Sequence, residues 1–466
     1  MPRLERGRAV RGCRVGRGVD DLRRHRQRRR GHPGRHEHDR EPPGRLVVLQ
    51  AGPPARHEGR GGRRASRANR RPRRHLLPDQ ARHRRSGMDS FVLLAIPLFI
   101  FAGNVMNEAN ITNNIMDFSN LIVGRFRGGL AYVNVLASMF FGGCTGSAIS
   151  DVAGLGTIEI PMMLKSGYEE DFSAAVTVSS SLQGPLIPPS IPMVIYASAV
   201  GTSTGALLLG GLIPGILLGV SNMILIYFIA KKRKYPKGAE IYDFKKVIKI
   251  ITQALPALLT PVVLIGGIVS GTFTPTEAAA IAVFYAIIVG FIVYRSLSIN
   301  KIYRICGDVA KKTGAIIILA GSATLFGRML ALERIPQMIV LGIKSVTSNQ
   351  ILTLLIINII LLLYGMVMDT LPALLILAPI FSPLVISLGV DPVHFGVVMV
   401  FNLMIGLMTP PYGMCLFTAT QICNCSVEEI SKAALPFLIV SIGVLFLITY
   451  VPEIVLFVPR LAGLVN

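Results

Sequence analysis

The sequence predicts an all-α polytopic membrane protein: an inverted repeat with two re-entrant helical hairpins and two broken helices. Three observations predict this fold class. Apolar segments long enough to cross a bilayer recur along most of the 466-residue chain, whose mean hydropathy is +0.55. Glycines and prolines recur at a constant spacing of 222 residues. Within each copy, prolines and polar residues interrupt apolar segments that would otherwise form continuous spans.

Residues 1–87 form an Arg-rich, low-complexity segment that differs from the rest of the chain. They hold 27 of the 48 Lys and Arg residues, all of them Arg, but no Lys, Ile, Phe, Tyr or Thr. This composition is compatible with electrostatic binding of nucleic acid or with a disordered basic tail. Because Arg, Gly, Pro and Ala dominate, as in a GC-rich gene read out of frame, we favour translation in the wrong frame, or a wrongly placed start, upstream of Met88. We assign the segment no function and no nucleic-acid partner, and it has no apolar core of the kind found in signal peptides.

From Met88 onward the chain is typical of a membrane protein. One helix needs about 20 apolar residues to cross a bilayer. Regular stretches of this kind are 90–108, 204–230, 253–270, 274–294, 313–332 and 433–458. Less regular apolar segments are 129–164, 169–201, 349–387 and 392–420. No soluble domain of useful size remains between them.

Two basic loops predict the orientation in the membrane. Residues 231–249 join two spans, and residues 294–312 follow the span that ends near Tyr294. Positively charged residues stay on the cytoplasmic side, so both loops are expected to face the cytoplasm. The short stretch SGTFTPTE between them then faces outward.

Comparison of the chain with itself at the 222-residue offset aligns seven pairs of identical residues, each pair either two glycines or two prolines. The pairs are Gly143 with Gly365, Pro161 with Pro383, Gly167 with Gly389, Gly184 with Gly406, Pro188 with Pro410, Pro189 with Pro411 and Pro214 with Pro436. Average Gly and Pro usage gives only about one such coincidence over this length, so we infer a duplication. The first copy is 88–235, the second is 301–466, and 236–300 holds a connecting loop and two scaffold helices.

Each copy contains a span, an interrupted apolar segment with a polar middle, a span broken near its centre, and a regular span. The interrupted segments suit re-entrant hairpins, which enter and leave the membrane on one side. Each copy then contributes three crossings, and two further spans connect the copies. Five crossings is an odd number, so the second copy is inverted relative to the first.

The two breaks are GPLIPPS, residues 184–190, and GLMTPPYG, residues 406–413. An unsatisfied backbone group in lipid costs several kcal/mol, so such breaks persist only where they line a cavity in the protein. Inverted repeats with discontinuous helices are typical of secondary transporters, in which half-helix N-termini favour anions and freed carbonyl groups coordinate cations. The breaks therefore predict a binding site.

The hairpin tips add oxygen atoms that suit a hard cation. Stretch 144–151 offers Thr145, Ser147, Ser150 and Asp151, and stretch 368–372 offers Asp369 and Thr370. Ser147 aligns with Asp369 at the repeat offset, and an intramembrane carboxylate is a functional candidate. The alternative is that the Ser and Thr side chains cap half-helices or pack at close helix contacts.

At these positions the sequence resembles the large membrane subunit of tripartite ATP-independent periplasmic (TRAP) transporters. The resemblance covers 87–466 nearly continuously, and its most specific stretches are GMDSFVLLAIPLFIFAGNVMN, FFGGCTGSAISDVAGLGTIEIPMM, GPLIPPSIPMVIYA and GLMTPPYGMCLF. It implies an elevator-type, ion-coupled permease of the bacterial cell inner membrane. By the same resemblance, a periplasmic binding protein delivers an organic acid, such as a C4-dicarboxylate or a sugar acid, for symport with sodium, and a small four-helix membrane subunit braces the large one.

The resemblance also implies where the ligands bind. Candidates for sodium binding are Gly146, Ser147, Asp151, Gly184, Pro188, Asp369, Thr370, Gly406 and Thr409. Candidates for substrate binding are Ser150, Pro189, Pro410, Pro411 and Arg328, although for Arg328 we favour a structural role with its side chain extended to the interface. No cofactor is expected, and no metal beyond sodium as coupling ion. Members of the family normally carry two hydrophobic helices before GMDSF, where this chain has the Arg-rich segment.

One alternative function remains open at this stage. A stand-alone ion-coupled carboxylate carrier of related architecture would share the inverted repeat without requiring a binding protein. An enzyme is not expected, because the chain has no HExxH, no GxSxG and no intramembrane His cluster. The spacing Cys423-Asn-Cys425 is weak evidence for a metal site, and we interpret most of the six cysteines as apolar fillers.

Overall fold

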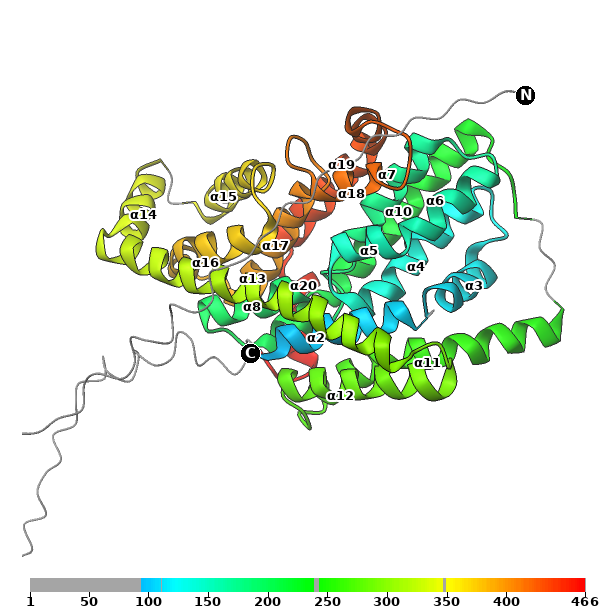
Figure 1. Ribbon diagram of the computed structural model, residues 1–466. Coiled ribbons are helices and arrows are strands. Elements are labelled where there is room, and N and C mark those ends of the chain that lie inside the picture. The colour runs from blue at the N-terminus through cyan, green and yellow to red at the C-terminus, as the bar shows by residue number, and fades with distance from the viewer. Residues whose placement is uncertain (1–93, 110, 239–242, 347–348, 466) are drawn as a thin grey trace, which may run out of the picture. The chain divides into compact units, whose positions relative to one another are not determined.

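The computed structural model describes residues 94–109, 111–238, 243–346 and 349–465. In these ranges every named element is a helix (Figure 1). The one β-type contact among them is an isolated bridge between Arg127 and Lys237. The predicted all-α fold class is therefore confirmed for the described residues. The Arg-rich segment 1–87 lies outside them.

The described helices of the first copy are α2 to α10. Their bounds are α2 Ala95–Glu108, α3 Ile111–Val123, α4 Gly129–Thr145, α5 Ala148–Gly154, α6 Gly156–Lys165, α7 Glu170–Ser181, α8 Ile191–Val200, α9 Thr204–Gly210 and α10 Leu212–Arg233. The connecting region consists of α11 Phe244–Val269, α12 Pro275–Ile288 and the π-helix η2 Val289–Val293. Helices α4 to α6 form the first hairpin, and α7 and α8 form the first broken helix.

The second copy contains α13 to α20. Their bounds are α13 Ile299–Leu332, α14 Ile335–Val346, α15 Gln350–Gly365, α16 Thr370–Ser387, α17 Pro392–Gly406, α18 Met414–Thr420, α19 Val427–Tyr450 and α20 Pro452–Leu461. Helices α15 and α16 form the second hairpin, and α17 and α18 form the second broken helix. The two interrupted segments and the two broken spans expected from the sequence are thus present.

The two copies use the same turn after each hairpin. The chain passes through Gly167 with φ 84° in the first copy and through Gly389 with φ 82° in the second. The next amide donates to a carbonyl oxygen of the preceding helix, over 3.1 Å in the first turn and 3.2 Å in the second. Only glycine adopts this left-handed conformation without strain, so the aligned glycines reflect one shared turn.

Five helices of the described residues are long and apolar enough to cross a membrane. They are Thr204–Arg233, Phe244–Val269, Pro275–Val293, Thr370–Ser387 and Val427–Tyr450. The stretch 370–387 is one arm of the second hairpin, so its length alone does not make it a crossing. The chain is therefore a polytopic helical membrane protein.

Two expectations about helix limits were wrong. The stretch 433–458 is not one helix, because α19 ends at Tyr450 and α20 begins at Pro452. Proline lacks an amide hydrogen and is favoured in the first turn of a helix, so it restarts the chain in a new helix there. Most of the basic stretch 294–312 is also not a loop, because α13 begins at Ile299 and runs for 34 residues.

Buried hydrogen bonds hold each hairpin against its own broken helix. In the first copy Asn134 of α4 donates to the Thr177 hydroxyl of α7 at 2.7 Å and accepts from Ser180 at 2.7 Å. In the second copy the Asn402 amide of α17 donates to the Asn358 side chain of α15 at 2.8 Å. Ser180 and Asn402 are 222 residues apart in the chain. Polar contacts of this kind between membrane helices contribute about 0.6 kcal/mol each, and here they link each hairpin to its own broken helix.

Candidate functional site

The first hairpin turns at Gly146 and Ser147. Gly146 ends α4 in the left-handed conformation, with φ 62°, and its amide donates to Gly142 at 3.0 Å. Ser147 then has extended backbone and begins α5, where its hydroxyl accepts a hydrogen bond from the Ser150 amide at 3.4 Å. The capping role considered for Ser147 is therefore present, and the residue is only half-buried.

The second hairpin turns at the aligned position. Asp369 has extended backbone, begins α16, and accepts a hydrogen bond from the Thr370 amide at 2.7 Å. The Thr370 hydroxyl lies 3.5 Å from the carbonyl oxygen of Leu403 in α17. Both tips thus present the N-terminal end of a helix, with a neutral oxygen in the first copy and a carboxylate in the second.

Each hairpin touches its broken helix through a pair of glycines. A Cβ atom on Gly142 would lie 2.4 Å from the Cα of Gly184, at the start of the first break. A Cβ atom on Gly406 would lie 2.2 Å from the carbonyl oxygen of Gly365. At the first tip, a Cβ on Gly146 would also meet the Pro189 carbonyl oxygen at 2.3 Å. The backbones of hairpin and break are therefore in close contact, and only glycine at the positions of Gly142, Gly146 and Gly406 permits it.

The two copies also pack crosswise. Helix α8 packs against α16 and α18 packs against α5, so the second half of each broken helix contacts the hairpin of the other copy. Between the two tips lies a cavity of about 70 Å³. Its lining includes Gly146, Ser147, Pro185, Asp369, Thr370 and Leu407. Four residues predicted to bind sodium, Gly146, Ser147, Asp369 and Thr370, therefore face one common space.

The other five predicted sodium-binding residues do not line this cavity. Gly184, Pro188 and Gly406 are buried in the breaks, and the Thr409 hydroxyl donates to the Ile405 carbonyl at 2.8 Å. Asp151 is 1% exposed but does not line the cavity between the tips. Its Oδ1 has no hydrogen-bond partner among the described residues, and neither oxygen of buried Glu159 has one.

A second, larger cavity adjoins the first and contains one of the predicted substrate-binding residues. It has a volume of about 320 Å³, shares Ser147, Ile149, Ile191 and Leu371 with the smaller cavity, and is also lined by Ser150. Pro189 is buried in the first break, whereas Pro410 and Pro411 are exposed, and neither cavity is lined by any of these three prolines. The side chain of Arg328, in α13, lies outside the described residues.

Three polar residues of the larger cavity were missed by sequence reasoning. Asn104 and Asn107 reach it from α2, and Lys312 reaches it from α13. Lys312 was assigned to a cytoplasmic loop, although its place in a helix continuous with the span 313–332 signals a different position. A cation, two amides and three hydroxyl-bearing residues, Thr145, Ser147 and Ser150, are the polar groups of a lining that is otherwise apolar, and such groups can orient an anionic ligand.

Two hairpins, two broken helices and a shared cavity at their junction define a membrane transport protein. The chain belongs to the tripartite ATP-independent periplasmic transporter family, as its DctM component, because the model of that family matches residues 72–454. The match begins inside the Arg-rich segment 1–87, and the out-of-frame interpretation of that segment stays a prediction. The resemblance seen in the sequence is confirmed, and the chain is a transporter subunit rather than an enzyme.

Individual relatives transport different acids. The chain is 40% identical over 378 residues to the sialic acid TRAP transporter large permease protein SiaM of Vibrio cholerae, with 80% of this chain and 88% of the relative covered. It is 39% identical over 376 residues to the C4-dicarboxylate TRAP transporter large permease protein DctM of Pseudomonas aeruginosa, with 81% and 88% covered. It is also 39% identical over 372 residues to the isethionate TRAP transporter permease protein DctMQ of Oleidesulfovibrio alaskensis, with 80% and 59% covered.

One solved structure shares the fold at low sequence identity. The Alcanivorax borkumensis YdaH transporter, whose structure is described as having an unusual topology, matches with a TM-score of 0.57 and 13% identity. The match covers 80% of this chain and 89% of that one. At this identity the likeness concerns the fold alone.

Proposed function

We propose that this chain imports an organic acid, such as a C4-dicarboxylate or a sugar acid, by symport with sodium across the bacterial inner membrane. The observation that carries the proposal is the junction of both hairpin tips and both breaks at one cavity, next to a larger cavity with a lysine. A periplasmic binding protein delivers the substrate, and a small membrane subunit supports the permease. The relatives named for sialic acid, C4-dicarboxylate and isethionate are TRAP permeases that carry different acids, which supports an organic acid as the cargo class.

Sodium would bind where each tip meets its break. In the first copy the ligands come from Gly146, Ser147, Gly184 and Pro188, and in the second from Asp369, Thr370, Gly406 and Thr409. Carbonyl, hydroxyl and carboxylate oxygens are the ligands that a hard cation prefers. A bound ion would link hairpin to broken helix, so sodium favours the conformation in which the tip is closed on the break. A ligand shifts a conformational equilibrium only by its difference in affinity between the two states, and these tip–break contacts supply that difference.

The substrate would bind in the larger cavity. Its volume, about 320 Å³, is in the range of small-molecule sites. Lys312 supplies the positive charge for a carboxylate, while Asn104 and Ser150 supply hydrogen-bonding groups. Residues Ser147 and Leu371 belong to both cavities, so a substrate in one and an ion in the other would stabilise the same position of the tips. This shared lining is the physical basis of coupling in the proposed mechanism.

The test is uptake by proteoliposomes that contain the complete complex. We expect an inward sodium gradient to drive uptake of at least one acid among sialic acid, a C4-dicarboxylate and isethionate, and replacement of sodium by potassium to abolish it. The variant Asp369→Ala should lose sodium-dependent uptake while it still inserts in the membrane. Full uptake by that variant would remove Asp369 from the site. Uptake that persists without the binding protein would instead favour the stand-alone carrier.

A further inference from the structure

Two cysteines and a carboxylate meet at the ends of three helices, away from both cavities. Cys423 and Cys425 lie in the loop between α18 and α19, and Glu170 is the first residue of α7. The two sulfur atoms and a Glu170 oxygen all lie within 4.8 Å of one another. Cys423 is buried, and the other two residues are half-buried. The group joins the first copy of the repeat to the second, and none of its members lines either cavity.

Hydrogen bonds hold these three residues in place. The Asn424 amide, between the two cysteines, donates to Glu170 Oε1 at 2.8 Å, which leaves the second carboxylate oxygen for another contact. The Cys423 thiol donates to the Ala419 carbonyl at 3.1 Å. The far end of the loop is fixed by a capping box, in which Ser426 and Glu429 bond to each other's backbone amides. The geometry of the cysteine loop is therefore set by the fold on both sides.

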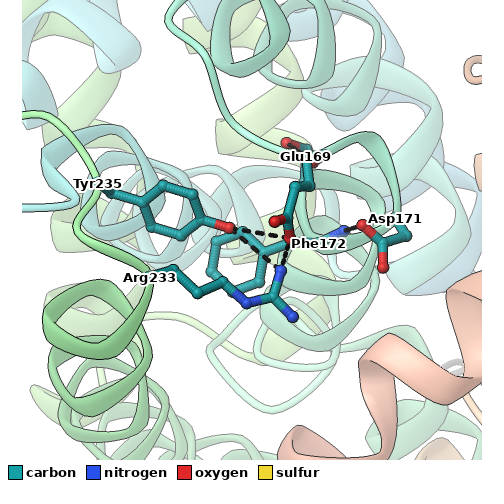
Figure 2. A network of polar contacts seen from close by, with 6 residues as sticks. Glu169, Asp171, Phe172, Arg233 and Tyr235 are labelled. Carbon is teal, nitrogen blue, oxygen red and sulfur yellow. Dashed lines mark hydrogen bonds and ion pairs between the residues drawn. The ribbon is translucent and has the colours of Figure 1, made fainter.

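Neighbouring charged residues are engaged elsewhere. Figure 2 shows Glu169 directed toward Arg233 and Tyr235, whereas Asp171 points away from them and accepts from the Phe172 amide at 2.7 Å. Arg233 pairs with Glu169 and lies over the Phe172 ring, 5.4 Å from its centre. Of three consecutive carboxylates, Glu170 is thus the one in contact with the cysteine loop.

The position of the group places both thiols on the cytoplasmic side of the membrane. The basic end of α10, Lys231 to Arg233, lies beside the group, and positive residues mark the cytoplasmic side. Thiols stay reduced there and remain free to bind metal.

We propose that Cys423, Cys425 and Glu170 bind a zinc ion or a cation of similar softness. Two thiolates and one carboxylate are ligands that zinc accepts, and three protein ligands leave a fourth position open to water. The bound ion would tie the start of α7 to the α18–α19 loop and so fasten the two copies of the repeat to each other. These cysteines are then ligands and not apolar fillers, and the inference is independent of the substrate and of the coupling ion.

The experiment is metal binding by the full-length chain, purified with its small membrane subunit and stripped with a chelator. Added Co²⁺ should give the near-ultraviolet charge-transfer band of thiolate ligands and visible bands of tetrahedral geometry, at one equivalent, and Zn²⁺ should displace it. Cys423→Ser and Cys425→Ser should each lower Zn²⁺ affinity by at least about 10-fold. Glu170→Gln should weaken binding while it keeps the thiolate band.

The control is Cys306→Ser, which removes an exposed cysteine of α13 and should leave binding unchanged. Size-exclusion elution of each variant shows whether it is folded. If the buried Cys423 does not tolerate substitution, Cys425→Ser and Glu170→Gln are sufficient to test the proposed site. A wild-type protein that gives no thiolate band with Co²⁺ and retains no Zn²⁺ at micromolar concentration would overturn the proposal. So would a band that survives in Cys425→Ser and disappears in Cys306→Ser.

Discussion

The glycine contacts between tips and breaks make a prediction that differs sharply between the two members of each pair. In Gly406→Ala the new Cβ would lie 2.2 Å from the Gly365 oxygen and 2.3 Å from its carbonyl carbon, both backbone atoms. In the reciprocal variant Gly365→Ala the nearest atom is the Leu403 oxygen at 3.2 Å. The first change therefore requires the hairpin to move away from the break by about 1 Å, whereas the second requires only a few tenths of an ångström.

The same asymmetry is reversed in the first copy. Gly142→Ala would place Cβ 2.4 Å from the Gly184 Cα, but Gly184→Ala meets no atom closer than 3.3 Å. Overpacking of this kind costs about 1–3 kcal/mol. If the cost falls on the state in which the tip is closed on the break, its population falls by roughly 5- to 150-fold. We therefore expect Gly142→Ala and Gly406→Ala to reduce sodium-dependent uptake by at least about 5-fold, and Gly184→Ala and Gly365→Ala to retain most of it.

Initial rates of uptake in proteoliposomes, at a range of sodium concentrations, measure this effect. Gly443→Ala is the matched control, because it adds the same methyl group to α19 and the new Cβ meets nothing within 4 Å. Equal losses in all four tip–break variants, or normal uptake by Gly406→Ala, would refute the inferred contact between tip and break.

Three further predictions concern single side chains. Lys312→Met should reduce organic-acid uptake by at least about 10-fold, because it removes the positive charge of the larger cavity. Lys311→Met breaks only an exposed pair with Asp308 and should not reduce uptake. Similar uptake rates in the two variants would exclude Lys312 as a substrate ligand. Asp369→Asn keeps a side-chain oxygen for the helix cap but removes the negative charge. The variant should therefore need a higher sodium concentration for half-maximal uptake, without loss of thermal stability. An unchanged sodium dependence would contradict a carboxylate ligand. Arg233→Gln should lower the free energy of unfolding in a thermal assay by no more than about 1 kcal/mol, because Arg233 and Glu169 are partly exposed. Lys232→Gln is the control. If both variants lose the same stability, the ion pair between Arg233 and Glu169 contributes nothing of its own.

The sequence was sufficient for the hairpins and the breaks because local rules determine them. A proline pair or a left-handed glycine limits the backbone regardless of what packs around it, so the positions of Gly146, Gly167 and Pro188 carry structural meaning by themselves. The match between Ser147 and Asp369 follows from the same logic, since both begin a helix at the hairpin tip. An N-cap needs a side-chain oxygen, and Ser and Asp both supply one.

What surrounds a residue was not predictable in the same way. Pro188 and Pro189 are buried although the aligned Pro410 and Pro411 are exposed. Helix α10 covers the first break, where a Cβ on Gly215 would lie 2.6 Å from the Ile187 Cγ1. This difference depends on the path of other helices, which the repeat does not encode. Lys312 was misplaced for a related reason, because a basic stretch has the same composition whether it forms a loop or the beginning of a long helix.

The repeat itself implies two equivalent ion sites, but the side chains make them unequal. At the proposed second site Asp369 carries a negative charge at the tip, whereas Ser147 at the first offers only a neutral hydroxyl. A carboxylate about 4 Å from a cation contributes about 4 kcal/mol of attraction at an effective dielectric constant of about 20, before the cost of desolvation is subtracted. The first site has to hold its ion with carbonyl groups from Gly146 and the first break, so its affinity depends on geometry more than on charge. Loss of Asp369 should therefore impair sodium-dependent uptake more than loss of Ser147, whereas displacement of the first tip by Gly142→Ala should be as damaging as the equivalent change at the second.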